Sequence, residues 1–190
     1  MLEWNEEIVE KIVKDSGTHS LGETCGRYVW AKAYDLKDEI NMLMKPFKRG
    51  VFGNMPFKVN KRLLVNETLY LLVIAGHLAV STRVPEENLS ANLGDYFESV
   101  AKYFPIKQLI NKNDRKDFFD RMGAFSSAIG KVDRNSINED ELTQTLLNVF
   151  YDYYPIQRHP LEYVMLKAII YKYYWEPFEI IWHATDRAYS

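Results

Sequence analysis

The sequence predicts an all-α fold, a compact bundle of about seven to eight helices. Apolar residues recur at helical spacing along most of the chain, and no stretch of useful length alternates apolar and polar residues as a half-buried strand would. The 190 residues are 47% hydrophobic and 14% aromatic, which is enough for a packed interior. We therefore expect one helical domain over residues 1–190, with a possible subdivision into a helical body over 1–150 and a C-terminal helix pair over 151–190.

The first two predicted helices cover residues 3–15 and 23–44. Apolar residues form one stripe along the first of them, and Ser16-Gly17 is expected to end it. Pro46 is expected to end the second helix, because proline lacks the N–H group that continues the helical hydrogen-bond ladder. The buried side of this second helix is predicted to consist of Tyr28, Val29, Ala33, Leu36, Ile40, Leu43 and Met44.

A basic segment over residues 45–62 follows, and it contains no acidic residue. Its glycines and prolines predict a loop. Cations neutralise phosphates and exposed aromatic rings stack on bases, so the segment indicates a nucleic-acid contact. The alternative is that its phenylalanines pin the loop to the body while its lysines keep it soluble. The predicted nucleic-acid-binding residues are Lys45, Lys48, Arg49, Phe52, Lys58, Lys61 and Arg62.

Residues 63–80 are apolar nearly all round, which predicts the central helix of the core. The longest unbroken apolar run, Leu69 to Ala75, is much shorter than the roughly 20 residues that a membrane span needs. His77 stands near the end of this helix without a clear partner, and we expect a hydrogen-bonded histidine rather than a functional one. Further helices are predicted over residues 86–104 and 114–129.

A second basic cluster lies around residues 107–121, but aspartates alternate with its cations. We expect most of these charges to pair along one solvated helix face. Downstream, residues 133–142 have the composition of a calcium loop, yet the central glycine is missing and Glu141 stands at position nine instead of twelve. A capping box at this place predicts a helix start instead. That helix should bury Leu142, Leu146, Val149 and Phe150.

The C-terminal part of the chain is rich in aromatic residues. Two helices are predicted over residues 160–175 and 177–188, divided by Pro177. Tyrosine and tryptophan serve both as core residues and as interface anchors, so the aromatic side chains have two interpretations. The first is a protein interface that includes Tyr171, Tyr174, Trp175, Phe178 and Trp182, and the second is core packing.

The sequence predicts no enzyme activity, no cofactor and no metal site. It contains neither a glycine-rich phosphate loop nor a His-Glu-x-x-His motif. The pairs His159/Glu162 and Glu179/His183 each supply two ligands, fewer than a zinc site needs. The single cysteine, Cys25, excludes an internal disulfide and favours a reducing, cytoplasmic location.

Short sequence patterns also resemble a known family. Asn66-Glu-Thr-Leu-Tyr-Leu-Leu-Val-Ile-Ala-Gly-His-Leu-Ala-Val80 precedes a helix that carries Asn92-Leu93-Gly94. Arg115-Lys116-Asp117-Phe118-Phe119 and Ile137-Asn-Glu-Asp-Glu-Leu142 follow. Over roughly residues 66–150 this arrangement resembles the small, all-helical subunit of type I CRISPR Cascade surveillance complexes.

The resemblance implies a non-catalytic subunit that contacts other protein subunits of its complex and holds guide RNA or displaced single-stranded DNA on a basic face. Where the family usually places arginines after the Leu-Gly, this chain has Asp95 and Glu98. The nucleic-acid path would then have moved, and the segment 45–62 is its most natural new position. The alternative function is a protein-only helical adaptor or oligomer subunit that docks through the C-terminal aromatic helices.

Overall fold

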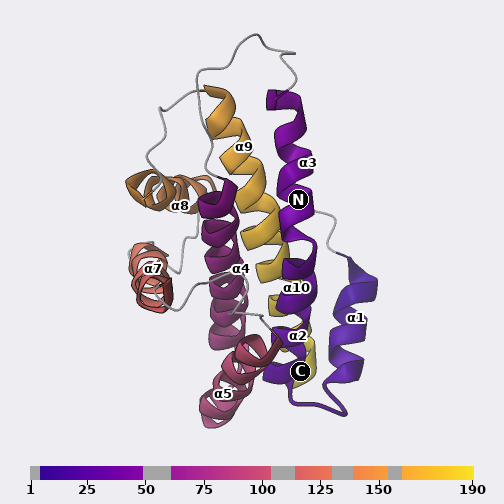
Figure 1. Cartoon of the computed structure of the whole chain (residues 1–190). Coiled ribbons are helices and arrows are strands. Elements are labelled where there is room, and N and C mark those ends of the chain that lie inside the picture. Colours follow the sequence, from indigo (N-terminus) through magenta and orange to yellow (C-terminus); the bar gives the residue numbers. More distant parts are fainter. Residues whose placement is uncertain (1–4, 49–60, 104–113, 130–138, 154–159) are drawn as a thin grey trace.

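A computed structural model of the chain describes residues 5–48, 61–103, 114–129, 139–153 and 160–190. Within these ranges the protein forms eight helices and no strand, which confirms the all-α prediction (Figure 1). The last helix contains a central turn of π-helix and therefore carries three labels. The helices are α1 (Glu6–Asp15), α2 (Leu21–Tyr34), α3 (Leu36–Lys48), α4 (Lys61–Arg83), α5 (Glu86–Tyr103), α7 (Asp114–Ile129), α8 (Glu139–Tyr153) and the continuous α9 (Pro160–Ile170), η1 (Tyr171–Trp175) and α10 (Glu176–Tyr189).

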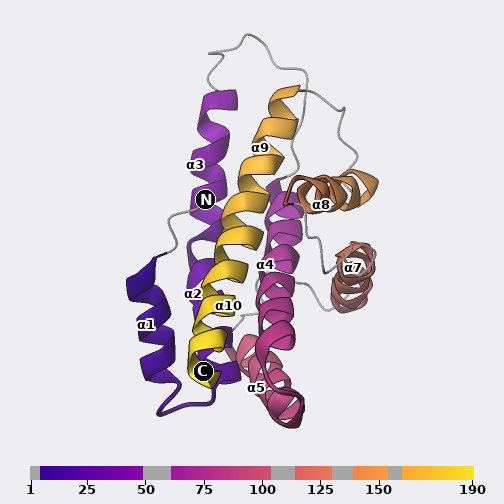
Figure 2. The ribbon, with the colours of Figure 1, turned by 180° about the vertical axis from the view of Figure 1, so that it is seen from behind.

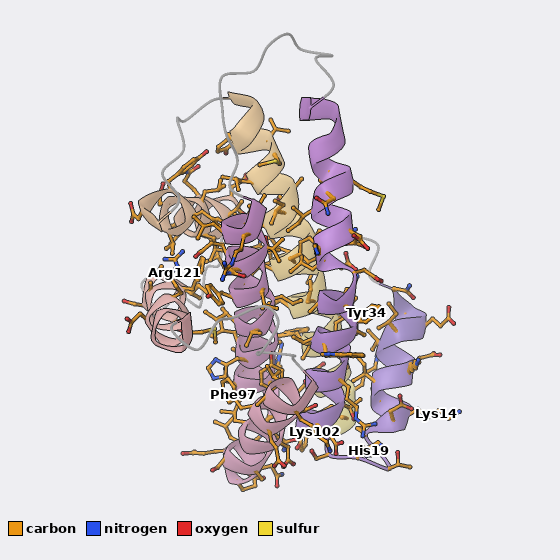
Figure 3. All side chains as sticks on the ribbon, viewed as in Figure 1. Lys14, His19, Tyr34, Phe97, Lys102 and Arg121 are labelled. Carbon is orange, nitrogen blue, oxygen red and sulfur yellow. The ribbon has the colours of Figure 1, made fainter. Side chains whose placement is uncertain are left out.

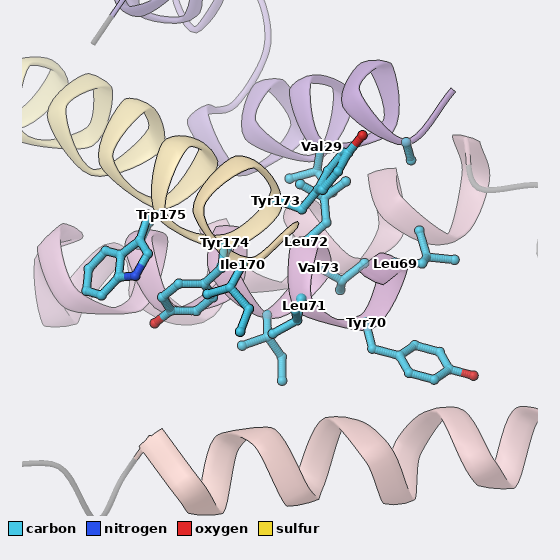
Figure 4. Packing of buried hydrophobic residues seen from close by; sticks show 14 of the residues in the cluster. Val29, Leu69, Tyr70, Leu71, Leu72, Val73, Ile170, Tyr173, Tyr174 and Trp175 are labelled. Atoms are coloured by element: carbon cyan, nitrogen blue, oxygen red, sulfur yellow. The ribbon is translucent and has the colours of Figure 1, made fainter. Parts of the chain in front are cut away.

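Helix α4 is the centre of the core, as its apolar sequence predicts. It packs against α2, α5, α7, η1 and α10, and its residues 69–75 are all buried. Figure 4 shows Leu71 and Leu72 of this helix in the same apolar cluster as Tyr173 and Tyr174. By length and composition α4 could cross a membrane, but 78% of the apolar window within Arg62–Arg83 is buried by other parts of this chain. Its apolar surface is therefore used for packing inside the bundle.

Helices α2 and α5 approach each other closely because two glycines four positions apart face α5. A Cβ added to Gly22 would lie 1.9 Å from the backbone oxygen of Asn92, and one added to Gly26 would lie 2.7 Å from Cβ of Ser99. Polar bonds tie the same contact together. The Gly22 N–H donates to Oδ1 of Asn92 over 3.0 Å, and the Ser99 hydroxyl donates to the carbonyl of Glu23 over 3.0 Å.

The predicted single helix over residues 23–44 is instead two helices that meet at an elbow. Helix α2 ends at Tyr34, Asp35 adopts φ −91° and ψ −4°, and its carbonyl accepts the N–H of Glu39 over 2.9 Å to begin α3. The prediction that Pro46 ends the helix is also wrong, because α3 continues to Lys48. Pro46 lies in the last turn of α3, where the missing N–H removes a single hydrogen bond near a helix end.

The expected break between the last two helices is likewise wrong. The N–H of Glu176 donates to the carbonyl of Tyr171, five residues earlier, so one turn of π-helix joins α9 to α10. Pro177 follows directly in the first turn of α10, where a proline needs no N–H donor. The wider turn thus accommodates the proline within one long helix, which Figures 1 and 2 show running along α4.

Helices α7 and α8 lie across the side of the bundle rather than along it (Figure 2). Phe125 of α7 and Phe150 of α8 pack edge to face, with ring centroids 5.9 Å apart. The predicted buried residues of α8 are confirmed at Leu142, Leu146 and Phe150, while Val149 is partly buried. Trp175 bonds to α8 through its indole N–H, which donates to the Thr143 hydroxyl over 3.0 Å.

Candidate nucleic-acid interface

The two ends of the basic segment lie on helices instead of a loop. Lys45 and Lys48 belong to the last turn of α3, and Lys61 and Arg62 open α4. The interpretation of the whole stretch 45–62 as a loop is therefore wrong at both ends. Arg49, Phe52 and Lys58 lie outside the described residues.

The fold brings these two helix ends into the same half of the molecule. Helices α3 and α4 are in contact and run in opposite directions, so the end of α3 and the start of α4 both lie in the upper half of the bundle in Figures 1 and 2. We name this region, formed by the last turn of α3 and the first turn of α4, the basic end. It contains the predicted site residues Lys45, Lys48, Lys61 and Arg62.

The first turn of α4 has an unusual charge for a helix start. Helices α1, α2, α3, α5, α8 and α10 all carry acidic residues in their first turns, as the positive end of a helix dipole favours. The first turn of α4 contains no acidic residue and carries Lys61 and Arg62 instead. Cations at this position destabilise a helix, whereas an anion is stabilised there. Lys45 and Lys48, by contrast, suit the negative end of the α3 dipole.

Arg121, from the second basic cluster, is not on a solvated face. Its Nε donates to Oε1 of Glu67 over 2.8 Å, and its Nη2 donates to Oε2 of the same carboxylate. The two side chains are 5% and 2% exposed, so this ion pair joins α7 to the core helix α4 in the interior. Figure 3 labels Arg121 on α7. Burial raises the pKa of Glu67, and the bonds from Arg121 oppose that shift. The prediction of a solvated pair is thus wrong for Arg121.

The predicted aromatic interface is largely core. Tyr174 and Trp175 are 1% and 6% exposed, and burial raises the pKa of Tyr174. Their assignment to an exposed protein interface is therefore wrong, because both residues belong to η1, which packs against α4. Tyr171, Phe178 and Trp182 are partly buried and pack against the same cluster.

A polar network that the sequence did not suggest joins the α2–α3 elbow to η1. Lys32 of α2 bonds Glu176, while Glu39 of α3 accepts from the Tyr173 hydroxyl and from Lys172 Nζ, the latter over 2.9 Å. Burial acts to raise the pKa of Glu39, but these two donors lower it overall. The partners are more than 130 positions apart, so no local pattern could have indicated the network. These bonds join both sides of the elbow to the last helix.

Burial shifts the pKa of both Cys25 and His77. Burial raises the pKa of Cys25 to about 12, so its thiol stays protonated at neutral pH and is a poor nucleophile. His77 is partly buried beside Phe97, and burial lowers its pKa. Among the described residues, no group of three or more histidine, cysteine, aspartate or glutamate side chains could hold a metal ion. His159 lies outside them.

A scan against protein-family models, a search of curated proteins and a search of solved structures each find no match to this chain.

Proposed function

We propose that this chain is a non-catalytic helical subunit of a nucleoprotein complex, similar in role to the small subunit of type I CRISPR Cascade complexes. In this proposal the basic end binds the phosphate backbone of single-stranded DNA or guide RNA. Contacts of this kind position a strand without reading its sequence. The remainder of the bundle contacts neighbouring protein subunits in the cytoplasm.

The observation that carries the proposal is the charge at the start of α4. Lys61 and Arg62 add positive charge to the positive end of a helix dipole, at a cost to helix stability that a bound phosphate would offset. The end of α3 adds Lys45 and Lys48 in the same half of the bundle. Because the whole chain has a formal net charge of −2, phosphate binding must depend on such a local surface.

A protein-only adaptor is the alternative function, and it has lost its main support. It depended on an exposed aromatic face on the last two helices. Tyr174 and Trp175, two of the strongest anchors in that set, are instead buried within the chain itself.

The test is the salt dependence of binding to a short, fluorescently labelled single-stranded RNA or DNA. Each neutralised phosphate contributes about −0.7 to the slope of log affinity against log salt for a single strand, so four contacts predict a slope near −3. The variant K45A/K48A/K61A/R62A should bind weakly and lose most of that slope.

A charge-matched control removes four exposed lysines elsewhere, in the variant K11A/K14A/K37A/K102A. It changes the net charge by the same amount, and we expect it to keep the parent slope. Circular dichroism of both variants checks that the helical content is retained. Equal slopes for the two variants would contradict the proposal, since binding would then follow net charge and not the basic end.

A further inference from the structure

Glu39 joins α3 to the last helix through two neighbouring residues of the π turn. The Tyr173 hydroxyl donates to Oε2 of Glu39, and Lys172 Nζ lies 2.9 Å from the same oxygen. Tyr173 is fully buried, so this contact is anchored in the core of the bundle. Lys32, on the other side of the elbow, also faces Glu39, and its charge helps to lower the pKa of the carboxyl. The carboxylate is therefore ionised at neutral pH and attracts both donors.

The described part of α3 has a small buried surface of its own. Between Leu36 and Leu43, the buried side chains are those of Leu36 and Ile40. Met42 on the same helix is 56% exposed. The π turn η1, by contrast, buries three consecutive aromatic side chains. Glu39 thus connects a lightly covered helix to a firmly packed turn.

A single residue separates α2 from α3 at the elbow. Because α2 ends at Tyr34 and α3 begins at Leu36, the backbone dihedral angles of Asp35 set the direction of α3. At a rise of about 1.5 Å per residue, the end of α3 at Lys48 is about 20 Å from Asp35. A rotation of about 20° at Asp35 would displace that end by about 7 Å. The end of α3 is one of the two parts of the basic end, in the upper half of the bundle (Figure 1).

We propose that Glu39 is a latch that holds α3 against η1, and that its release lets α3 pivot about Asp35. The latched position is the one in the structure. In the released position the end of α3 moves relative to the start of α4, so the two parts of the basic end change their separation. The alternative is that the apolar contacts of Leu36 and Ile40 are enough to hold α3, in which case Glu39 has no effect on its position.

The consequence for binding rests on the proposed function. A strand that contacts both parts of the basic end favours the latched position, because the released position offers it one part at a time. Binding of the strand then stabilises the latch, and an intact latch strengthens binding by the same factor. The latch would therefore regulate the basic end from the opposite side of α3.

The test measures the position of α3 by pulsed electron paramagnetic resonance, with spin labels on Met42→Cys and Val164→Cys. These two positions are 56% and 61% exposed, on α3 and α9. The natural Cys25 is buried and its pKa is raised to about 12, so it should remain unlabelled. Glu39→Ala and Tyr173→Phe remove the latch from its two sides. Each should raise the released population about tenfold, the factor that a hydrogen bond to a charged group contributes, and add a second distance component.

Asp38→Ala is the matched control for Glu39→Ala. Asp38 is exposed and, like Glu39, is an acidic residue of the first turn of α3. Both substitutions therefore remove the same charge from the positive end of the same helix dipole. Asp38→Ala should keep the parent distance distribution. Thermal melting checks that each variant is folded.

The outcomes separate the latch from the proposed function. Unchanged distances in Glu39→Ala, or equal changes in Glu39→Ala and Asp38→Ala, would overturn the latch, and unchanged distances in Tyr173→Phe would overturn its anchoring in the core. The affinity of Glu39→Ala for the labelled single strand, relative to the parent, should equal the ratio of the two latched fractions. If the distances change and the affinity does not, the pivot stands and its role in binding is overturned. If the parent shows no salt-dependent binding, the proposed function fails, whereas the distances still decide the latch.

Discussion

The buried ion pair between Glu67 and Arg121 provides the sharpest test of how this fold is held together. In the variant Arg121→Met, an apolar chain of similar length replaces the guanidinium, and the Glu67 carboxylate stays buried without its two charge-assisted hydrogen bonds. Removing one partner of such a pair costs about 3–5 kcal/mol. A domain has only about 5–15 kcal/mol of stability, so the variant should lose about a fifth of it or more.

The loss should depend on pH with a definite sign. Burial raises the pKa of Glu67 in the parent, and Arg121 opposes the shift. Without Arg121 the native carboxyl binds a proton more readily than the unfolded one, so stability decreases as pH rises above the unfolded pKa near 4.5. The variant should therefore regain stability when the pH is lowered from 7 toward 5. In the parent, Glu67 should also make stability decrease as pH rises, but more weakly than in the variant.

Urea unfolding followed by tryptophan fluorescence measures both effects. The double variant Glu67→Leu/Arg121→Met removes both charges and should be close to the parent in stability, because an apolar pair of similar volume can replace a buried ion pair. Lys167→Ala breaks the exposed pair with Asp140 and serves as a control that should change little. The reasoning would be refuted if Arg121→Met were as stable as the parent at pH 7, or if the double variant were as unstable as the single one.

Two further predictions concern His77 and the glycine contact between α2 and α5. Because burial lowers the pKa of His77, the native state binds fewer protons than the unfolded state, and stability should fall as pH drops below 6.5. His77→Phe should flatten this part of the pH–stability curve, and an unchanged curve would exclude His77 as its source. Gly26→Ala should cost about 1–3 kcal/mol by overpacking against Ser99. Gly94→Ala, with no atom within 4 Å of the new Cβ, should stabilise α5 by about 1 kcal/mol, and equal melting temperatures for the two glycine variants would contradict this difference.

The sequence alone determined the fold class and the position of most helices. The prediction over residues 114–129 agrees with the bounds of α7, and that over 86–104 agrees with α5 as far as Tyr103, because residue 104 lies outside the described residues. The spacing of apolar residues and the capping box are both local patterns that extend over one or two helical turns. They can therefore be recognised within the sequence of a single helix. The central position of α4 followed in the same way, because a helix that is apolar all round has to be covered.

The tertiary structure decided how helices bend and which side chains meet. Pro46 and Pro177 looked like helix ends, but α3 continues to Lys48, and a turn of π-helix leads into the turn of α10 that contains Pro177. The elbow at Asp35 had no local signal in glycine or proline, and the bonds on either side of it join residues more than 130 positions apart.

The candidate site shows the same division between local and long-range information. Positive charge over residues 45–62 was visible in the sequence, and the predicted residues that the structure describes lie at two helix ends in the same half of the bundle. That Tyr174 is core while Tyr34 is exposed could not be read from composition, since a tyrosine suits both environments. Whether a tyrosine is buried depends on which other helix covers it. That is decided by contacts between segments that lie far apart in the chain.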